Sequence, residues 1–243
     1  MPAVTSLASI AAIGTLLGAA SIAASVSVGP SPGHSPGATL LDARMPSAPP
    51  QKTDHTAPVG TVVIGNGAAN VNSSSVTLSL RASDDVGVQQ MCLSNRGTCT
   101  DFIPYQSVVS WALPSGSGTK TVSVWFRDAA GNISAVARAL VVLDTMAPQD
   151  GHVLATAGDG QVSLSWNGFK DLHSGITAYR VVFASKEAPG NCLKGTVASD
   201  GLSLATTVSG LTNGSAYGFR VCARDGAGNI SGGVVATARP MRR

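Results

Sequence analysis

Apolar and polar residues alternate with a period of two along most of the chain after residue 58. The clearest run is Lys120-Thr-Val-Ser-Val-Trp-Phe126, in which Val122, Val124 and Phe126 fall on one face and Trp125 on the other. Alternation of this kind predicts a half-buried β-strand. Similar runs recur in both halves of the chain, so the pattern predicts strands throughout.

A repeated octapeptide separates alternating runs in both halves of the chain. Arg127-Asp-Ala-Ala-Gly-Asn-Ile-Ser134 returns as Arg224-Asp-Gly-Ala-Gly-Asn-Ile-Ser231, and each copy follows an alternating run and precedes another apolar run. Asp at the first position and Gly at the fourth favour a type I turn, and a Gly in the left-handed region after such a turn closes a short hairpin loop. We therefore predict a β-hairpin at each copy, in which the Asn bonds its own backbone.

The composition agrees with an all-β protein. Charged residues make up 12% and aromatic residues 5% of the 243 residues, whereas there are 28 Gly and 13 Pro, and no helical periodicity is visible after the first 25 residues. Many short strands between turn residues favour sandwiches, and the length suits two domains and a tail. We predict an apolar segment at 1–27, a linker at 28–57, and β-sandwiches at 58–144 and 145–239.

The first 27 residues form an apolar, small-residue segment that resembles a secretory signal. No Lys or Arg precedes Arg44, so the positive region of a typical signal is missing, and the segment is either removed or kept as a weak anchor. The Pro- and Gly-rich residues 28–57 predict an extended linker. We expect a secreted or cell-surface protein with no membrane span in its mature form.

The net charge of +3 equals the contribution of Arg239, Arg242 and Arg243, so the body of the chain is close to neutral. It therefore lacks the basic surface that nucleic-acid binding requires.

The four cysteines divide evenly between the two halves. Cys92 and Cys99 flank a six-residue segment, and Cys192 and Cys222 form a second pair. Even pairing predicts two disulfides in an oxidising compartment. Zinc is the competing interpretation, but there is no C-x-x-C motif and no His at ligand spacing.

Several motifs in the first predicted sandwich carry a family resemblance. Asp54-His-Thr-Ala-Pro58, Val76-Thr-Leu-Ser-Leu80, Asp84-Asp-Val-Gly-Val88, Gly118-Thr-Lys-Thr-Val122 and Arg127-Asp-Ala-Ala-Gly-Asn132 resemble the bacterial immunoglobulin-like repeats of surface proteins and secreted enzymes. The resemblance spans most of residues 54–144.

The second predicted sandwich opens with Asp144-Thr-Met-Ala-Pro148, a near copy of the start of the first, and it resembles a fibronectin type III domain. The resemblance implies a core tryptophan, matched by Trp166, and a tyrosine corner, matched by Tyr217 with Leu211 beneath it. Fibronectin type III domains often lack cysteines. Because Cys222 alternates with the inward residues of its strand, we expect its disulfide to hold a loop over the outer face.

Trp125 is the candidate ligand contact. Alternation places it opposite Val122, Val124 and Phe126, on the outer face of its sheet, where a flat ring can stack on a sugar or a partner. The alternative is that a neighbouring strand or loop covers it. Trp111, by contrast, is expected in the core.

No catalytic constellation is evident. The sequence has no H-E-x-x-H motif, no phosphate-binding loop followed by Lys, and no Cys beside a base. His152 and His173 are the histidines of the predicted folded part, and the loop of His173 with Asp171 and Ser174 is ordinary loop composition. We therefore predict that the chain is not an enzyme.

Calcium is the one cofactor that the residues motivate, because oxygen donors at one pole suit a hard cation. In a sandwich of this topology the incoming chain, the loop between the second and third strands and the last hairpin share a pole. The alternative for these residues is turn chemistry alone. The candidate ligands are Asp54, Asp84, Asp85, Asp128 and Asn132 in the first sandwich, and Asp144, Asp171, Asp225 and Asn229 in the second.

Together these features predict a non-catalytic structural or adhesive module that is secreted or attached to the cell surface. It acts as a spacer, or binds an extracellular polysaccharide or a surface protein. The alternative is the accessory, substrate-binding region of an extracellular hydrolase.

Overall fold

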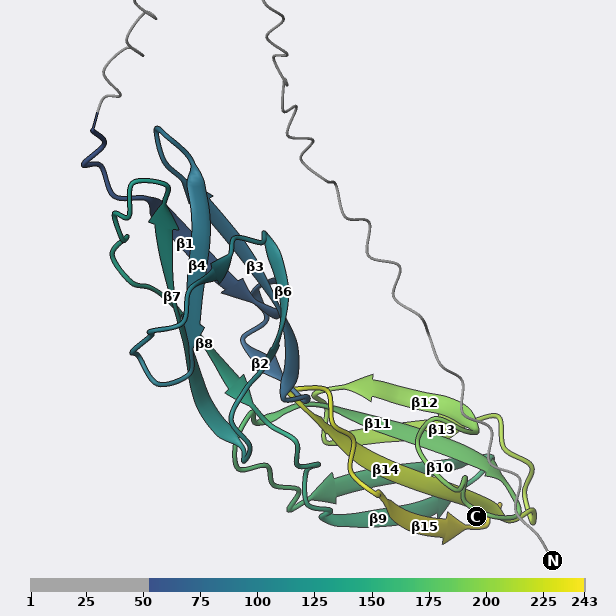
Figure 1. The fold of residues 1–243 in the computed structure, drawn as a ribbon. Coiled ribbons are helices and arrows are strands. Elements are labelled where there is room, and N and C mark those ends of the chain that lie inside the picture. The colour runs from purple at the N-terminus through teal and green to yellow at the C-terminus, as the bar shows by residue number, and fades with distance from the viewer. Residues whose placement is uncertain (1–52, 243) are drawn as a thin grey trace, which may run out of the picture. The chain divides into compact units, whose positions relative to one another are not determined.

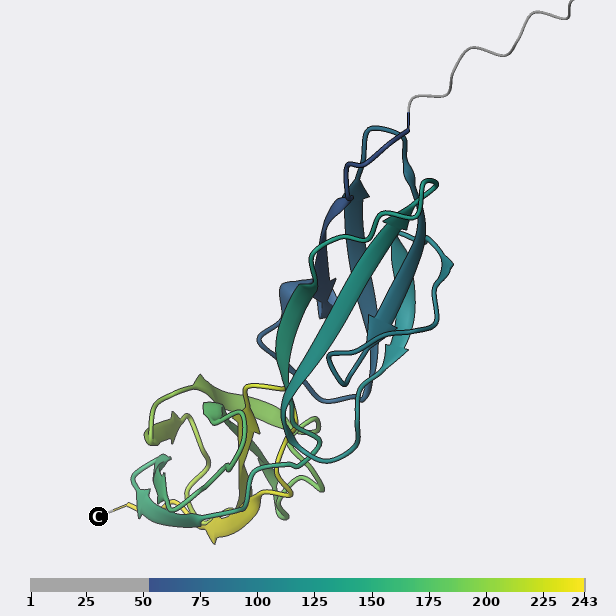
Figure 2. The same cartoon turned by 60° about the vertical axis from the view of Figure 1, so that its left-hand side comes forward.

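The computed structural model describes residues 53–242 as two β-sandwiches in tandem (Figures 1 and 2). The predicted signal-like segment, 1–27, and most of the predicted linker, 28–57, lie outside these residues. No helix in the described range is long and apolar enough to cross a membrane.

The first sandwich consists of a three-stranded and a five-stranded sheet. The smaller sheet has the order β1-β3-β6, with β1 (Val59–Ile64), β3 (Ser75–Ser83) and β6 (Val108–Ala112). The larger has the order β2-β8-β7-β4-β5, with β2 (Asn70–Val71), β8 (Ala137–Leu143), β7 (Gly118–Asp128), β4 (Val88–Ser94) and β5 (Ile103–Pro104). Neighbouring strands are antiparallel except β2 and β8, and a 3-10 turn, η1 (Gly65–Gly67), follows β1.

The second sandwich has a three-stranded and a four-stranded sheet, both antiparallel. The smaller has the order β13-β10-β9, with β13 (Ala205–Ser209), β10 (Gln161–Asn167) and β9 (His152–Gly158). The larger has the order β12-β11-β14-β15, with β12 (Thr196–Gly201), β11 (Ile176–Ser185), β14 (Tyr217–Asp225) and β15 (Val234–Ala238).

The alternating residues form the two cores. On β7, Val122, Val124 and Phe126 are fully buried and pack in the core of the first sandwich. On β14, Phe219 and Val221 do the same in the second. The period-two pattern therefore assigned the buried faces of these strands correctly.

Both octapeptides form the predicted turns. Gly131 and Gly228 have φ of 96° and 93°, the left-handed region in which a Cβ is strained. Each turn is closed by its final serine, which the sequence reasoning missed. The Ser134 hydroxyl accepts a hydrogen bond from the Phe126 N–H at 2.9 Å, and Ser231 accepts one from Ala223 at 3.1 Å.

The aromatic landmarks of the second sandwich lie where the resemblance placed them. Trp166 is buried in the core and Leu211 lies in the same cluster. The Tyr217 hydroxyl accepts a hydrogen bond from the Thr212 N–H at 3.0 Å, which forms a tyrosine corner. This hydrogen bond favours the phenolate and lowers the pKa of Tyr217. In the first sandwich Trp111 is only half-buried against the core, because its indole N–H donates to Asn95 at 2.8 Å.

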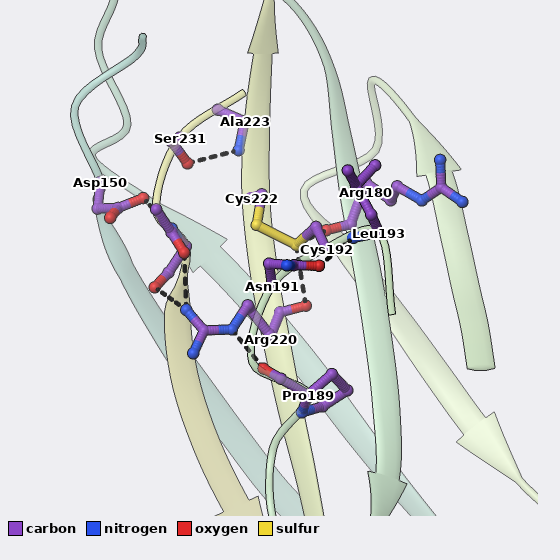
Figure 3. Close-up of a disulfide and its surroundings, with 12 residues drawn as sticks. Asp150, Arg180, Pro189, Asn191, Cys192, Leu193, Arg220, Cys222, Ala223 and Ser231 are labelled. Carbon is purple, nitrogen blue, oxygen red and sulfur yellow. Dashed lines mark hydrogen bonds between the residues drawn. A yellow bond between two sulfur atoms is a disulfide. The ribbon is translucent and has the colours of Figure 1, made fainter. Parts of the chain in front are cut away.

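The cysteines form the two predicted disulfides, Cys92–Cys99 and Cys192–Cys222. Figure 3 shows the second bond joining β14 to the loop between β11 and β12. Its sulfurs pack with Val182 in a cluster separate from the core, on the outer face of the sheet as expected. Arg220 holds the same loop by donating from Nε to the Pro189 carbonyl at 2.7 Å.

The two disulfides should differ in their contribution to stability. Cys192–Cys222 closes a loop of sequence separation 30, and Cys92–Cys99 one of 7. The entropy removed from the unfolded chain grows with loop length, so replacing Cys192 and Cys222 together by Ala should lower the free energy of unfolding by about 3–4 kcal/mol. The matched pair Cys92→Ala and Cys99→Ala should lower it by about 2–3 kcal/mol. Urea titrations measure both, and a larger loss from the shorter loop would contradict the ordering.

Candidate functional site

The acidic residues of the first sandwich gather at one pole as expected. Asp54, Asp84 and Asp85 each place one carboxylate oxygen within 4.8 Å of the others. Asp84 also forms a turn, because its Oδ2 accepts hydrogen bonds from the N–H groups of Val86 and Gly87. Its Oδ1 is buried and has no hydrogen-bond partner among the described residues.

Asp128 organises the last hairpin of this pole from a buried position, with 3% of its surface exposed. Its Oδ1 accepts hydrogen bonds from the N–H groups of Gly131 and Asn132 at 2.7 and 2.9 Å. The Asn132 amide donates to Oδ2 of Asp128 at 2.8 Å and to the carbonyl of Asp54 at 3.3 Å. The expectation that Asn132 bonds its own backbone is therefore wrong: its side chain ties the hairpin to the incoming chain.

These contacts set the pKa of Asp128. Burial raises it, because a carboxylate loses water, but the hydrogen bonds from Asn132 and Gly131 stabilise the anion, and the net effect lowers the pKa from its ordinary value of 3.8.

The second sandwich repeats the arrangement. Asp144, Asp171 and Asp225 each have a carboxylate oxygen within 4.8 Å of the others. Asp225 accepts hydrogen bonds from the N–H groups of Ala227 and Asn229. The Asn229 amide donates to Oδ2 of Asp225 and to the carbonyl of Asp144, both at 2.8 Å, as Asn132 does in the first copy.

Ser174 is a member of this second pole that the calcium hypothesis did not include. Its hydroxyl donates to Oδ2 of Asp144 at 2.6 Å and accepts the Ala227 N–H at 3.2 Å. Asp171 accepts the N–H groups of His173, Ser174 and Gly175. The carboxylates of this pole thus accept hydrogen bonds from the protein itself, which is what the turn interpretation requires. Calcium at either pole stays a prediction.

Trp125 lies on the outer face of the five-stranded sheet and is half-buried. It pairs across β7 and β4 with Cys92, so the disulfide-bonded segment after β4 begins beside it. Further along this face the Arg127 guanidinium lies 4.2 Å from the centroid of the Phe102 ring and donates from Nε to Oε1 of Gln90 at 2.7 Å. The sequence reasoning missed this Arg–Phe–Gln group, because Phe102 lies outside any alternating run.

Neither His152 nor His173 has catalytic partners among the described residues. His173 and Asp171 are linked only by a backbone hydrogen bond of the turn. The sequence does contain two G-x-S-x-G stretches, Gly29–Gly33 and Gly33–Gly37, in the range outside the described residues. The nucleophile elbow needs its Ser between a strand and a helix, and a Pro follows the Ser in both stretches, which disfavours helix at that point.

The fold and the disulfide-bonded loops define the chain as a protein of tandem β-sandwiches. Residues 146–236 match the fibronectin type III domain family, and they form such a domain. This match lies outside residues 54–144, so their resemblance to bacterial immunoglobulin-like repeats stays a prediction.

Among curated proteins, chitinase A1 of Niallia circulans is 33% identical over 189 residues, which cover 73% of this chain and 25% of that protein. The chain therefore spans about a quarter of the length of this relative. Among solved structures, a segment of titin superposes with a TM-score of 0.53 and 18% identity, over 77% of this chain and 67% of that one. Fibronectin(III)-like modules of CbhA from Clostridium thermocellum superpose with a TM-score of 0.48 and 13% identity, over 75% of this chain and 95% of that one. The titin similarity supports the fold alone.

Acid should weaken the folded state through Asp128. Because its folded-state pKa is depressed below 3.8, the ionised carboxylate stabilises the fold above about pH 4, and this contribution disappears as the pH falls through the folded-state pKa. Asp128→Asn keeps the shape and an acceptor oxygen but cannot ionise. In urea unfolding between pH 6 and 2, wild type should have a larger free energy of unfolding than Asp128→Asn at pH 6. The difference between the two proteins should shrink as the pH falls.

The control for this experiment is Asp101→Asn, since Asp101 is exposed and its carboxylate accepts no hydrogen bond from the described residues. Because this control removes no such hydrogen bonds, it should lower the free energy of unfolding at pH 6 by less than Asp128→Asn does. A constant difference for Asp128→Asn would contradict the role assigned to its carboxylate.

The calcium hypothesis predicts a metal-dependent melting temperature. A ligand that binds only the folded state stabilises it, so millimolar calcium should raise the melting temperature and EDTA should reverse the rise. Asp171→Asn, which keeps an acceptor for the turn, should reduce the effect at the second pole. Differential scanning calorimetry with magnesium as the control ion measures this. A melting temperature that is the same in calcium and in EDTA would leave turn chemistry as the whole role of these residues.

Proposed function

We propose that this chain is a non-catalytic accessory module of an extracellular polysaccharide hydrolase, and that it contacts polysaccharide through the outer face that carries Trp125. The observation that carries the proposal is the length of the match to chitinase A1. It covers 189 residues, whereas the fibronectin type III match covers residues 146–236. The similarity to this enzyme thus includes parts of both sandwiches rather than one common domain.

Two further features of the chain support an extracellular location. Two disulfides need an oxidising environment to form and persist, and the apolar segment 1–27 resembles a signal. Secretion or attachment at the cell surface places the module where an insoluble polysaccharide is found. No catalytic role is assigned to any residue of the chain.

Trp125 is the residue proposed to contact the polymer. A partly exposed indole on a sheet face offers an apolar ring with a polar N–H, which suits stacking on one face of a sugar ring. Its backbone position is held by the β7–β4 pairing and by the disulfide at Cys92.

A spacer that binds no ligand is the second candidate. The observation in its favour is that most carboxylates of the poles accept hydrogen bonds from the protein itself, through Asn132 at one and through Asn229 and Ser174 at the other. Such a module would hold an enzyme or an adhesive protein away from a surface, with the predicted linker at 28–57 adding reach.

Binding to insoluble polysaccharides separates the two candidates. We expect the chain to sediment with chitin or another insoluble polysaccharide, and Trp125→Ala to weaken binding about tenfold, the loss typical of a central aromatic contact. Leu154→Ala is the control, because Leu154 is an exposed apolar residue on the outer face of β9. If folded wild type sediments with none of the polymers, the spacer is favoured. If Trp125→Ala binds as tightly as wild type, Trp125 is not the contact residue.

A further inference from the structure

Positive charge lies on both sides of Trp125 on the outer face of the first sandwich. Arg127 follows Trp125 by two residues on β7, and Arg138 on β8 pairs with Ser123, two residues before it. Residues that alternate along a strand point to the same face, about 7 Å apart. The register therefore places Trp125 between the positions of two arginines on one sheet face.

Among the residues that the structure describes, neither Arg127 nor Arg138 has an acidic partner. The salt bridges of the described residues are those of Arg180 and Arg224 with Asp200, in the second sandwich. The segment that follows β4 adds one charge of each sign, Arg96 and Asp101, and these offset each other. None of the outward positions of the three central strands is acidic: Gln90, Cys92 and Ser94 on β4, Thr121, Ser123, Trp125 and Arg127 on β7, and Arg138, Leu140 and Val142 on β8.

Arg127 is held in place before any ligand arrives. Nε and Nη2 both donate to Oε1 of Gln90, and the guanidinium lies over the Phe102 ring, a favourable cation–π arrangement. A guanidinium that is already ordered loses less entropy on binding than a free one. Arg138 is exposed and makes no side-chain hydrogen bond with the described residues, so its full donor set is free for a ligand.

From this arrangement we infer that the polymer bound at Trp125 is a polysaccharide whose sugars carry carboxylate groups, of the uronic acid type. The inference rests on the proposed function, since it takes the Trp125 face as the polysaccharide contact. The indole requires a sugar ring to stack on, and the guanidinium groups match the planar fork of a carboxylate. A neutral polysaccharide can stack on the indole but cannot pair with the arginines. A polyanion without sugar rings can pair with the arginines but offers no ring for the indole.

The test compares polymers that differ in one property. Polygalacturonic acid and its fully methyl-esterified form share a backbone but differ in charge, and polyglutamate carries carboxylates without sugars. Affinity electrophoresis of the whole chain should show tighter binding to the free acid than to the ester or to polyglutamate. Binding to the acid should fall as salt rises, because exposed charges are screened.

Arg138→Gln is the variant that changes charge with the least effect on the fold. It should weaken binding to polygalacturonic acid roughly two- to fivefold, the range of an exposed ion pair, and leave binding to the ester unchanged, while Arg138→Lys retains part of the effect. Arg81→Gln is the matched control, since Arg81 is exposed on β3 of the opposite sheet. Trp125→Ala should weaken binding to acid and ester alike.

The outcomes separate this inference from the proposed function. Equal binding to acid and ester, with loss in Trp125→Ala, overturns the charged-polymer inference and leaves the polysaccharide contact standing. Binding to polyglutamate as tight as to the acid also overturns it, because charge alone then suffices. Folded protein that binds neither form of the polymer, and no chitin either, overturns both.

Discussion

Each sandwich depends on one buried carboxylate that links its last hairpin to its first residues. Asp128 and Asp225 are almost fully buried, and burying a charge is unfavourable unless hydrogen bonds replace the lost water. Backbone N–H groups of the turn and the amide of Asn132 or Asn229 supply these hydrogen bonds. The same amides then donate to the carbonyls of Asp54 and Asp144. The turn, the anion and the start of the sandwich therefore form one unit.

The hydrogen bonds within the poles distinguish them from the outer face of the five-stranded sheet. At the poles the polar groups largely bind one another, which stabilises turns that carry little apolar surface. On the outer face of the five-stranded sheet, Cys92 and Ser123 are buried, whereas Trp125 and Arg127 are partly exposed and Arg138 is exposed. Aromatic and arginine side chains are typical of binding surfaces, which is why the proposed polysaccharide contact is assigned to this face.

Much of the fold could be predicted because its signals are local. Alternation at Val122, Val124 and Phe126 identified a buried strand face, Asp and Gly spacing identified the turns, and the even pairing of cysteines identified both disulfides. Trp111 is half-buried rather than fully in the core, because its indole N–H reaches Asn95. Alternation predicts the direction in which a side chain points, but it does not predict which polar group of another segment will bind it.

The sequence by itself determined the class of the fold, the hairpins and the strand faces, since backbone preference and alternation act over a few residues. It also named the acidic residues of each pole. The tertiary structure alone decided what these residues do: Asn132 and Asn229 reach segments about 80 residues away in the chain, Ser174 joins Asp144, and Phe102 comes to lie under Arg127. Contacts between distant segments depend on how the sheets pack, and no local pattern encodes that packing.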